Sequence, residues 1–343
     1  MKIAVLGRTK MLFDTIDALM QDGNEIVLIG TCKAEAEYSV NEKDYQMIAH
    51  KLSVPFFCSS KINSAEILQI IRGVGAEIAV SVNWLTILGE EVISSFPMGV
   101  LNAHCGDLPR YRGNACPNWA IINGENEYAL CIHYMEPYKL DAGNILLKKY
   151  YPINDNTTIT DIYENLEKDV PKLFCNAIKK VSNHEKGVEQ SRDPKDSLRC
   201  YPRIPNDGFI DWEAHGKDIV RLIRASCKPF EGAFTFYGED KIHIMDAMFE
   251  EFDCPCSYIP GQIIEINRKH NAVSIASGDG KIIVKNVEIN GKRYNATEIF
   301  TSLRIRLNYC SQNEIWSLRK KIMDMEERIS EMERRLNQGI VVR

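Results

Sequence analysis

The chain has 343 residues, of which 45% are hydrophobic and 26% charged, and a formal net charge of -5. This is the balance of an average soluble globular protein and argues against disorder, collagen-like repeats and a membrane protein. At roughly 100–200 residues per domain, the length predicts two domains. The negative charge argues against nucleic acid as a partner, because proteins that bind nucleic acids usually carry a basic surface.

The N-terminus and the cysteines indicate a cytoplasmic protein. Met1 to Leu6 includes a lysine and the segment meets Arg8 soon after, so it lacks the long apolar core of a signal peptide. No stretch reaches the ~20 uncharged apolar residues of a membrane-spanning helix. The eleven cysteines are odd in number and scattered, and only Cys254 and Cys256 are close, without a zinc-binding spacing. We therefore expect reduced thiols and no metal.

From Met1 to about Leu147, short β-branched runs alternate with segments of helical period. The runs are KIAVLG, EIVLIG, AEIAVSV, GVLNAH and ALCIHYM. This alternation is typical of an α/β fold in which helices connect the strands of a parallel sheet. A helix follows from about Thr158 to Val181. We expect a catalytic domain over residues 1–182 and a polar, proline-containing linker over 183–205.

Residues 206–308 have a different pattern, with five short strands around one helix near Ala214 to Ser226. This predicts a second, smaller domain, a β-barrel or sheet. Residues 313–338 are then expected to form a helix of their own. Its apolar residues follow the a/d repeat of a coiled coil: Ile315, Leu318, Ile322, Met325, Ile329, Met332 and Leu336.

The charges beside this repeat favour a parallel homodimer through residues 315–336. In a parallel pair Lys321 and Arg328 face Glu326 and Glu333 of the partner, whereas an antiparallel pair sets the basic residues against each other. The alternative is an amphipathic helix that packs on its own barrel.

The residues most suited to catalysis follow two of the predicted strands. Asn102 and His104 end one strand and point the same way, because strand side chains alternate. An imidazole can accept a proton near neutral pH, and an amide can donate to an oxyanion. Asp141, beyond the next strand, could orient His104. Cys105 faces the opposite side of the strand, which argues against a cysteine–histidine dyad.

Two other common sites lack their motifs. The first strand ends in Gly7-Arg8-Thr9, which is neither a G-x-G-x-x-G sequence nor a P-loop. No group of histidines and carboxylates has metal-ligand spacing. Dinucleotide, ATP and metal chemistry are therefore disfavoured.

The combined motifs resemble the 10-formyltetrahydrofolate-dependent formyltransferases. The match consists of Asn102, His104, the loop 108–113 (LPRYRG) and the segment 140–145 (LDAGNI), and it extends over about residues 1–305 through 203–212 and 232–235. The chain departs from the family at 105–107 and 137–139. The resemblance implies a Rossmann-like catalytic domain, an OB-like C-terminal barrel and 10-formyltetrahydrofolate as formyl donor, with no metal.

The resemblance also implies roles for residues. Formyl transfer to an amine passes through a tetrahedral intermediate, so Asn102 would polarise the formyl oxygen, His104 would act as general base and Asp141 would orient His104. The loop after the fourth strand helps to hold the pterin in relatives. The expected folate-binding residues, of which Trp84 and Leu88 could equally be core, are Asn83, Trp84, Leu85, Ile87, Leu88 and Tyr138.

The acceptor amine is predicted from the segment 31–44. In methionyl-tRNA formyltransferases this region carries a basic insertion, but here two lysines stand against four carboxylates, which would repel a phosphate backbone. Glycinamide ribonucleotide enzymes usually lack a second domain. Segments 32–38, 81–84 and 115–119 are similar to sugar N-formyltransferases.

We therefore expect an acceptor that is a dTDP- or UDP-linked amino sugar, in a pathway such as lipopolysaccharide O-antigen synthesis. Arg8, Arg112 and Arg203 would bind its diphosphate. A methionyl-tRNA formyltransferase, and a non-catalytic scaffold on a degenerate transferase, are the alternatives.

Overall fold

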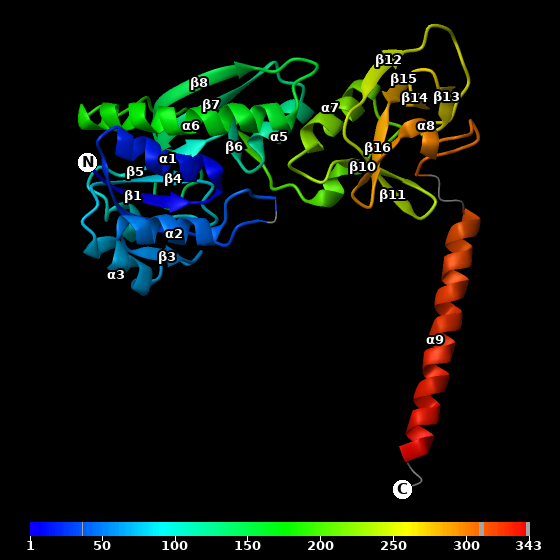
Figure 1. Ribbon diagram of the computed structural model, residues 1–343, viewed down its shortest axis with the longest axis horizontal. Helices are drawn as coiled ribbons and strands as arrows, with labels where there is room; N and C mark the ends of the chain where they lie inside the picture. The colour runs from blue at the N-terminus through cyan, green and yellow to red at the C-terminus, as the bar shows by residue number, and fades with distance from the viewer. Residues whose placement is uncertain (36, 309–311, 341–343) are drawn as a thin grey trace.

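A computed structural model describes the chain except residues 36, 309–311 and 341–343, and in the C-terminal helix it describes side chains from 318 to 334. The N-terminal domain is built on a seven-stranded sheet of order β3-β2-β1-β4-β5-β7-β8 (Figure 1). Its strands are β1 (Lys2–Gly7), β2 (Glu25–Thr31), β3 (Phe56–Cys58), β4 (Ile78–Val82), β5 (Val100–His104), β7 (Glu127–Tyr134) and β8 (Ile145–Pro152). Its helices are α1 (Thr9–Gln21), α2 (Glu42–Leu52), α3 (Ala65–Gly73), α4 (Glu90–Ile93), α5 (Cys116–Ile122) and α6 (Ile159–Ser182).

Helices cover both faces of this sheet, as the near-continuous apolar strands require. Alternate residues of β1 enter different cores: Ile3 and Val5 pack with residues of α1 and α6, whereas Ala4 and Leu6 pack with residues of α3 and α4. The α6 helix begins at a capping box between Thr158 and Asp161. The α/β, Rossmann-like class expected for this domain is thus confirmed.

The expectation of an all-parallel sheet is wrong at one edge. β7 runs antiparallel to β5 and β8 antiparallel to β7, with Asn102 opposite His133 and His104 opposite Cys131. β7 therefore ends beside Leu101, at the start of β5, and not at the carboxyl edge of the sheet. The loop after β7 must therefore run back along the sheet to bring Asp141 to the site. The register of the paired strands does not predict the path of this loop.

The C-terminal domain contains two four-stranded antiparallel sheets around one apolar core. The first sheet holds β10 (Ala233–Tyr237), β11 (Asp240–Ile244), β16 (Asn286–Ile289) and β17 (Lys292–Asn295). The second holds β12 (Met248–Glu251), β13 (Ile263–Asn267), β14 (Ala272–Ala276) and β15 (Gly280–Val284), and the helices are α7 (Gly216–Ser226) and α8 (Ala296–Ile299). A C-terminal sheet domain is confirmed. The finer expectation of an OB-like barrel is not confirmed, because the described strands form two separate sheets.

The segment between the domains packs closely on the N-terminal domain. It contains two short 3-10 turns (Pro194–Asp196 and Pro205–Gly208) and β9 (Leu198–Cys200), which pairs in parallel with β6 (Tyr111–Gly113). The Trp119 indole donates to the Tyr201 carbonyl at 2.9 Å, and the Asn118 amide donates to the Ala225 carbonyl at 2.8 Å. These bonds join α5 to the linker and to α7, and they fix the two domains relative to each other.

The last element is α9 (Gln312–Ile340), which extends away from the C-terminal domain in Figure 1. Its described side chains, from 318 to 334, are all exposed. The structure has a helix over this range, and its pairing with another helix is not confirmed. None of the helices in the described part of the chain is long and apolar enough to cross a membrane.

Candidate functional site

A cavity of about 240 Å³ opens at the carboxyl ends of β4 and β5. Seven of the predicted site residues line it: Asn102, His104, Asp141, Asn83, Trp84, Leu85 and Ile87. Open α/β sheets place their ligands at this edge. The cavity therefore lies where the predicted catalytic and folate-binding residues meet.

Two predicted folate-binding residues lie elsewhere. Leu88 is buried in the core beneath α3 and α4, as the alternative interpretation of that residue held. Tyr138 is 68% exposed and does not line the cavity, and its backbone amide donates to the Leu88 carbonyl at 3.1 Å. The backbone of Tyr138 thus anchors the loop after β7, and its side chain has no contact with the cavity.

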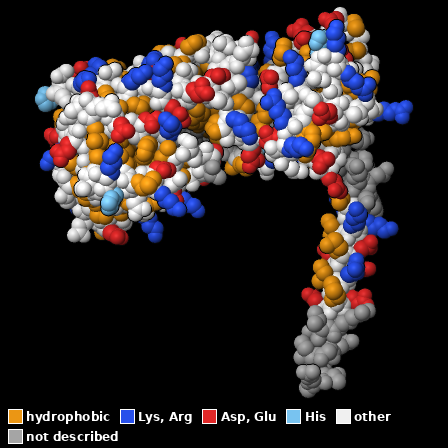
Figure 2. Space-filling model, viewed as in Figure 1, with side chains coloured by type: hydrophobic (Ala, Val, Ile, Leu, Met, Phe, Trp, Pro, Cys, Tyr) orange, Lys and Arg blue, Asp and Glu red, His pale blue; other side chains and the backbone are white. Residues whose placement is uncertain are grey.

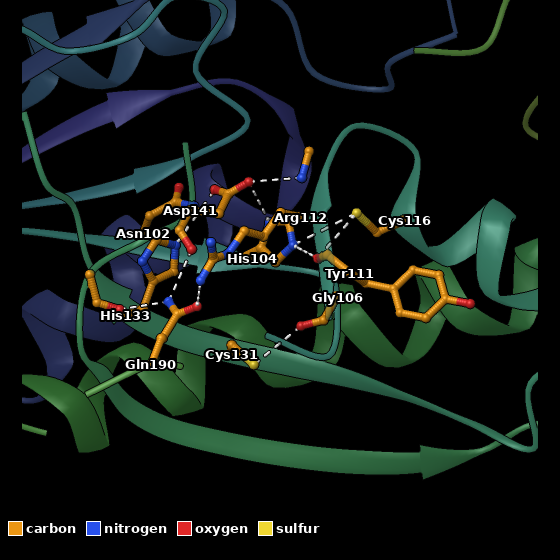
Figure 3. A network of polar contacts seen from close by, with 12 residues as sticks. Asn102, His104, Gly106, Tyr111, Arg112, Cys116, Cys131, His133, Asp141 and Gln190 are labelled. Atoms are coloured by element: carbon orange, nitrogen blue, oxygen red, sulfur yellow. Dashed lines mark hydrogen bonds and ion pairs between the residues drawn. The ribbon is translucent and has the colours of Figure 1, made fainter. Parts of the chain in front are cut away.

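His104 lies between two acceptors (Figure 3). Its Nδ1 is 3.6 Å from Oδ2 of Asp141, and its Nε2 donates to the Tyr111 carbonyl at 2.6 Å. A neutral imidazole has one N–H, so it can donate to only one of the two. At 3.6 Å, Nδ1 and Asp141 Oδ2 are too far apart for a hydrogen bond, so the Tyr111 carbonyl is the acceptor that the ring engages.

The backbone and the linker hold Asp141 in place. The Gly113 amide donates to Asp141 Oδ2 at 3.0 Å, and Asp141 itself has a positive φ of 48°. The buried Gln190 side chain donates to the carbonyls of Asp141 and Gly143 at 3.0 and 2.7 Å. The Gln190 Oε1 in turn accepts from Arg112 at 2.8 Å. The linker thus shapes the loop that carries the carboxylate.

A second histidine, His133, completes the site and was not predicted. It is 1% exposed, and burial, the largest effect, lowers its pKa to about 4, so the ring is neutral. Its Nδ1 lies 2.8 Å from the Tyr134 carbonyl, which can only accept, so Nδ1 carries the proton. His133 Nε2 must then accept from Asn102 Nδ2 at 3.2 Å. This bond fixes the amide of Asn102, with one N–H left for a ligand.

The buried neutral His133 makes stability depend on pH. Its folded pKa of about 4 lies below the ordinary 6.5, so the unfolded chain binds more protons between these values. Above pH 6.5 His133 is neutral in both the folded and the unfolded chain. The free energy of unfolding then falls as the pH drops from 6.5 toward 4. We expect the wild type to lose about 3 kcal/mol more unfolding free energy over this range than a His133→Asn variant. Urea unfolding at several pH values measures it, and parallel curves would contradict it.

Four non-glycine residues that line the cavity have positive φ angles. Thr9, Asn83, Ala115 and Asp141 have φ values of 78°, 52°, 51° and 48°. Non-glycine residues adopt such angles at a cost, and they persist where the surrounding structure imposes them, often at functional sites. Four backbone positions around the cavity are therefore held in conformations that the surrounding structure must impose.

The thiols near His104 are not nucleophiles. Burial raises the pKa of Cys105 to about 12, although this residue does line the cavity. A hydrogen bond with Cys200, together with burial, raises the pKa of Cys116, whose Sγ lies 3.7 Å from His104 Nε2. Both thiols stay protonated at neutral pH, and only a thiolate would attack a carbonyl group.

The three arginines predicted to bind a diphosphate are engaged within the protein. Arg8 is 5% exposed and donates to the Lys33 carbonyl and to Glu35, at 3.1 and 3.0 Å. Arg112 donates to Gln190, as described above. Arg203 donates to the Asp207 carbonyl and to Ser226 Oγ, both at 3.1 Å, in the joint between the domains. These side chains hold loops and domains together, which does not favour the predicted role.

Several carboxylates of the acidic segment 31–44 make contacts within the protein. Glu35 pairs with Arg8 at 3.0 Å. Glu42 accepts from the Ala34 amide at 3.2 Å, and Asp44 closes the capping box at the start of α2. The Arg8 guanidinium thus offsets the charge of Glu35, while Glu42 and Asp44 accept hydrogen bonds from the local backbone. Within the described residues, no cluster of three or more histidine, cysteine or acidic side chains could hold a metal ion.

Comparison with known proteins assigns the family. Residues 1–178 match the formyl transferase family, and residues 204–304 match the formyl transferase C-terminal domain. The chain belongs to the formyl transferase family. It is therefore an enzyme of formyl transfer, as the sequence motifs predicted. The predicted limits of the two domains, the linker and the terminal helix stay predictions.

Relatives of this formyl transferase include two curated methionyl-tRNA formyltransferases. The enzyme of Citrifermentans bemidjiense is 26% identical over 85% of this chain and 90% of its own length. That of Akkermansia muciniphila is 30% identical over 74% of this chain and 80% of its own length. A solved N-formyltransferase from Helicobacter canadensis, in complex with folinic acid and dTDP-3-aminofucose, has a TM-score of 0.61 and 19% identity, over 86% of this chain and 100% of its own. At that identity the likeness shows the fold alone.

These relatives contradict the predicted acceptor. Curated methionyl-tRNA formyltransferases match this formyl transferase over both of its domains, whereas a nucleotide-linked amino sugar was expected. The interpretation based on the charge of residues 31–44 was therefore wrong. A function in lipopolysaccharide or O-antigen synthesis is not confirmed.

Proposed function

We propose that this formyl transferase moves the formyl group of 10-formyltetrahydrofolate to the amino group of methionine attached to tRNA. The observation that carries the proposal is that methionyl-tRNA formyltransferases match the chain across both domains. The linker and the C-terminal domain would then bind the acceptor tRNA beside the catalytic cavity.

The reaction needs three groups, and the cavity offers them within one network. The amine nitrogen attacks the formyl carbon, and the carbonyl oxygen takes the negative charge of a tetrahedral intermediate. The free N–H of Asn102 would stabilise this oxygen. His104 would take the proton of the amine and pass it to N10 of the folate as the C–N10 bond breaks. The products are the formylated amine and tetrahydrofolate.

His104 must exchange partners to act as the base. Its Nε2 donates to the Tyr111 carbonyl at 2.6 Å, so this nitrogen can accept the amine proton only after it has released that carbonyl and the ring proton has moved to Nδ1. Asp141 would hold the other side of the ring through Nδ1, 3.6 Å away. The carboxylate would then stabilise the imidazolium that forms during transfer.

The loop after β4 fits a flat, partly apolar ligand such as the pterin of the folate. Leu85 and Ile87 line the cavity and are about half exposed. Trp84 packs edge-on against Phe57, with ring centroids 6.3 Å apart, and its indole donates to Thr86 at 3.1 Å. Exposed apolar side chains at the mouth of a cavity are typical of ligand sites. This supports Asn83, Trp84, Leu85 and Ile87 as the folate-binding loop.

The strand pair β6–β9 supports an acceptor that carries nucleotides. Arg199 lies opposite Arg112 in this pair, beside the cavity-lining Gly113. Arg199 is exposed and stacks over the exposed Tyr201 ring, with 5.5 Å between the guanidinium carbon and the ring centroid. Bases stack on aromatic rings, and arginine binds phosphate, so such a pair suits the single-stranded end of a tRNA.

A transfer assay with labelled formyl donor tests the proposal. We expect 10-formyltetrahydrofolate labelled in its formyl group to label methionyl-tRNA, recovered by acid precipitation, in proportion to the enzyme added. Uncharged tRNA is the control, because it has the same phosphates but no α-amino group. No label in methionyl-tRNA, with folded enzyme and intact donor, would contradict the proposed acceptor.

A further inference from the structure

The α9 helix presents an apolar face that nothing in the described chain covers. Five large apolar side chains on it are each 49–60% exposed: Leu318, Ile322, Met325, Ile329 and Met332. Figure 2 shows hydrophobic side chains along this helix, with charged side chains beside them. α9 follows residues 204–304, the range that matches the family's C-terminal domain. The face therefore belongs to neither the catalytic cavity nor the core of the second domain.

The spacing of these five residues fits a partner that is itself a helix. They alternate at intervals of four and three, a period of 3.5 residues, which keeps the apolar stripe aligned only when two helices wind around each other. A helix of 29 residues is about 43 Å long, and in water most helical stability comes from packing of the apolar face. α9 thus has the pattern of one strand of a coiled coil.

We propose that α9 pairs in parallel with α9 of a second copy of this chain. The charges that flank the stripe determine this choice. In a parallel pair Lys321 of one copy lies opposite Glu326 of the other, and Arg328 lies opposite Glu333. Two-fold symmetry repeats both pairs, so all four contacts are attractive. In an antiparallel pair Lys321 meets Arg328, and basic residues repel.

The residue types in the stripe agree with this geometry. Ile322 and Ile329 occupy the a positions, and Leu318, Met325 and Met332 the d positions. β-branched residues at a together with leucine at d favour two parallel strands, and the methionines at d share with leucine a side chain that is unbranched at Cβ. The helix is thus self-complementary in both shape and charge, and the proposal does not depend on which amine the enzyme formylates.

The mass of the full-length protein tests the pairing. We expect the wild type to sediment with twice the mass of one chain and to dissociate on dilution. Replacing Ile322 and Ile329 with lysine should give the mass of one chain at every concentration, because four charges would enter the seam. A wild type that stays at the mass of one chain at the highest concentration reached would overturn the proposal, and so would a lysine variant of unchanged mass.

Charge exchange tests the direction of pairing. K321E/R328E should form a homodimer with a dissociation constant on the order of a hundredfold weaker, because attraction becomes repulsion at four contacts. E326K/E333K should fail in the same way, and an equimolar mixture of the two variants should recover a dimer. The matched control is K320E/R334E, which makes the same change in net charge on the outer face and should stay dimeric. A K321E/R328E protein that dimerises as tightly as the wild type would exclude the parallel pair.

Discussion

Replacing His104 with alanine is expected to lower kcat of formyl transfer by about 10²–10⁴-fold, the usual contribution of a positioned general base. The side chain is 7% exposed and lies in the cavity, between the carboxylate of Asp141 and the carbonyl of Tyr111. Without the imidazole, the amine has no group nearby that can accept its proton and return it to the leaving nitrogen. Single-turnover rates with a saturating formyl donor measure this step.

Two further variants separate catalysis from folding. Asp141→Asn keeps the shape of the side chain and the bond from the Gly113 amide, so its melting temperature should stay near the wild type while kcat falls. His50→Ala removes an exposed histidine on α2 and should leave kcat unchanged. If His104→Ala is folded and turns over like His50→Ala, His104 is not the base.

Replacing Asn102 with alanine is expected to lower kcat by about 10²–10³-fold with little change in KM for the donor, the loss typical of one oxyanion donor. His133 holds the amide through a 3.2 Å bond, so its free N–H is fixed before the substrate arrives. The interaction strengthens as charge develops on the formyl oxygen, and for this reason it affects kcat more than KM. Steady-state kinetics at varied donor concentration separates the two constants.

The control for this loss is Asn156→Ala, which removes an exposed amide in the loop before α6. It should match the wild type in both constants. A rise in KM of Asn102→Ala with unchanged kcat would mean that the amide binds the ground state, and the proposed role at the oxyanion would then be wrong.

Part of the site follows from local sequence rules. Asn102 and His104 share a face because strand side chains alternate, and the ends of buried strands at one sheet edge place the loop after β4 beside them. The same logic finds Trp84, Leu85 and Ile87 at the cavity. These inferences need only the period of a strand and the direction of neighbouring strands.

Other features depend on long-range pairing that local rules do not specify. His133 enters the site because β7 runs antiparallel to β5 and sets it opposite Asn102. Had that direction been recognised, the alternation in the run from Tyr128 to Tyr134 would have indicated the second histidine. Gln190 is harder to predict, since it lies in a polar segment and is buried only because the linker packs against the loop of Asp141.

Charge was the least reliable guide to the acceptor. Arg8 and Glu35 neutralise each other across 27 residues, and Asp44 caps the start of α2. Formal charge along a segment does not show which groups remain free for a ligand, because many serve caps and ion pairs. The two exposed groups that support a nucleic acid, Arg199 and Tyr201, lie in a linker whose composition gave no such signal.

The most direct test of the account is a competition in which methionyl-tRNA, glycinamide ribonucleotide and a dTDP-linked amino sugar share one tube with the enzyme and limiting 10-formyltetrahydrofolate. We expect mass spectrometry to find the added formyl group on methionyl-tRNA, and no product with His104→Ala. Formyl transfer to the sugar or the ribonucleotide in preference to the tRNA would contradict the proposed acceptor. Equal transfer by His104→Ala would contradict the proposed chemistry of the cavity.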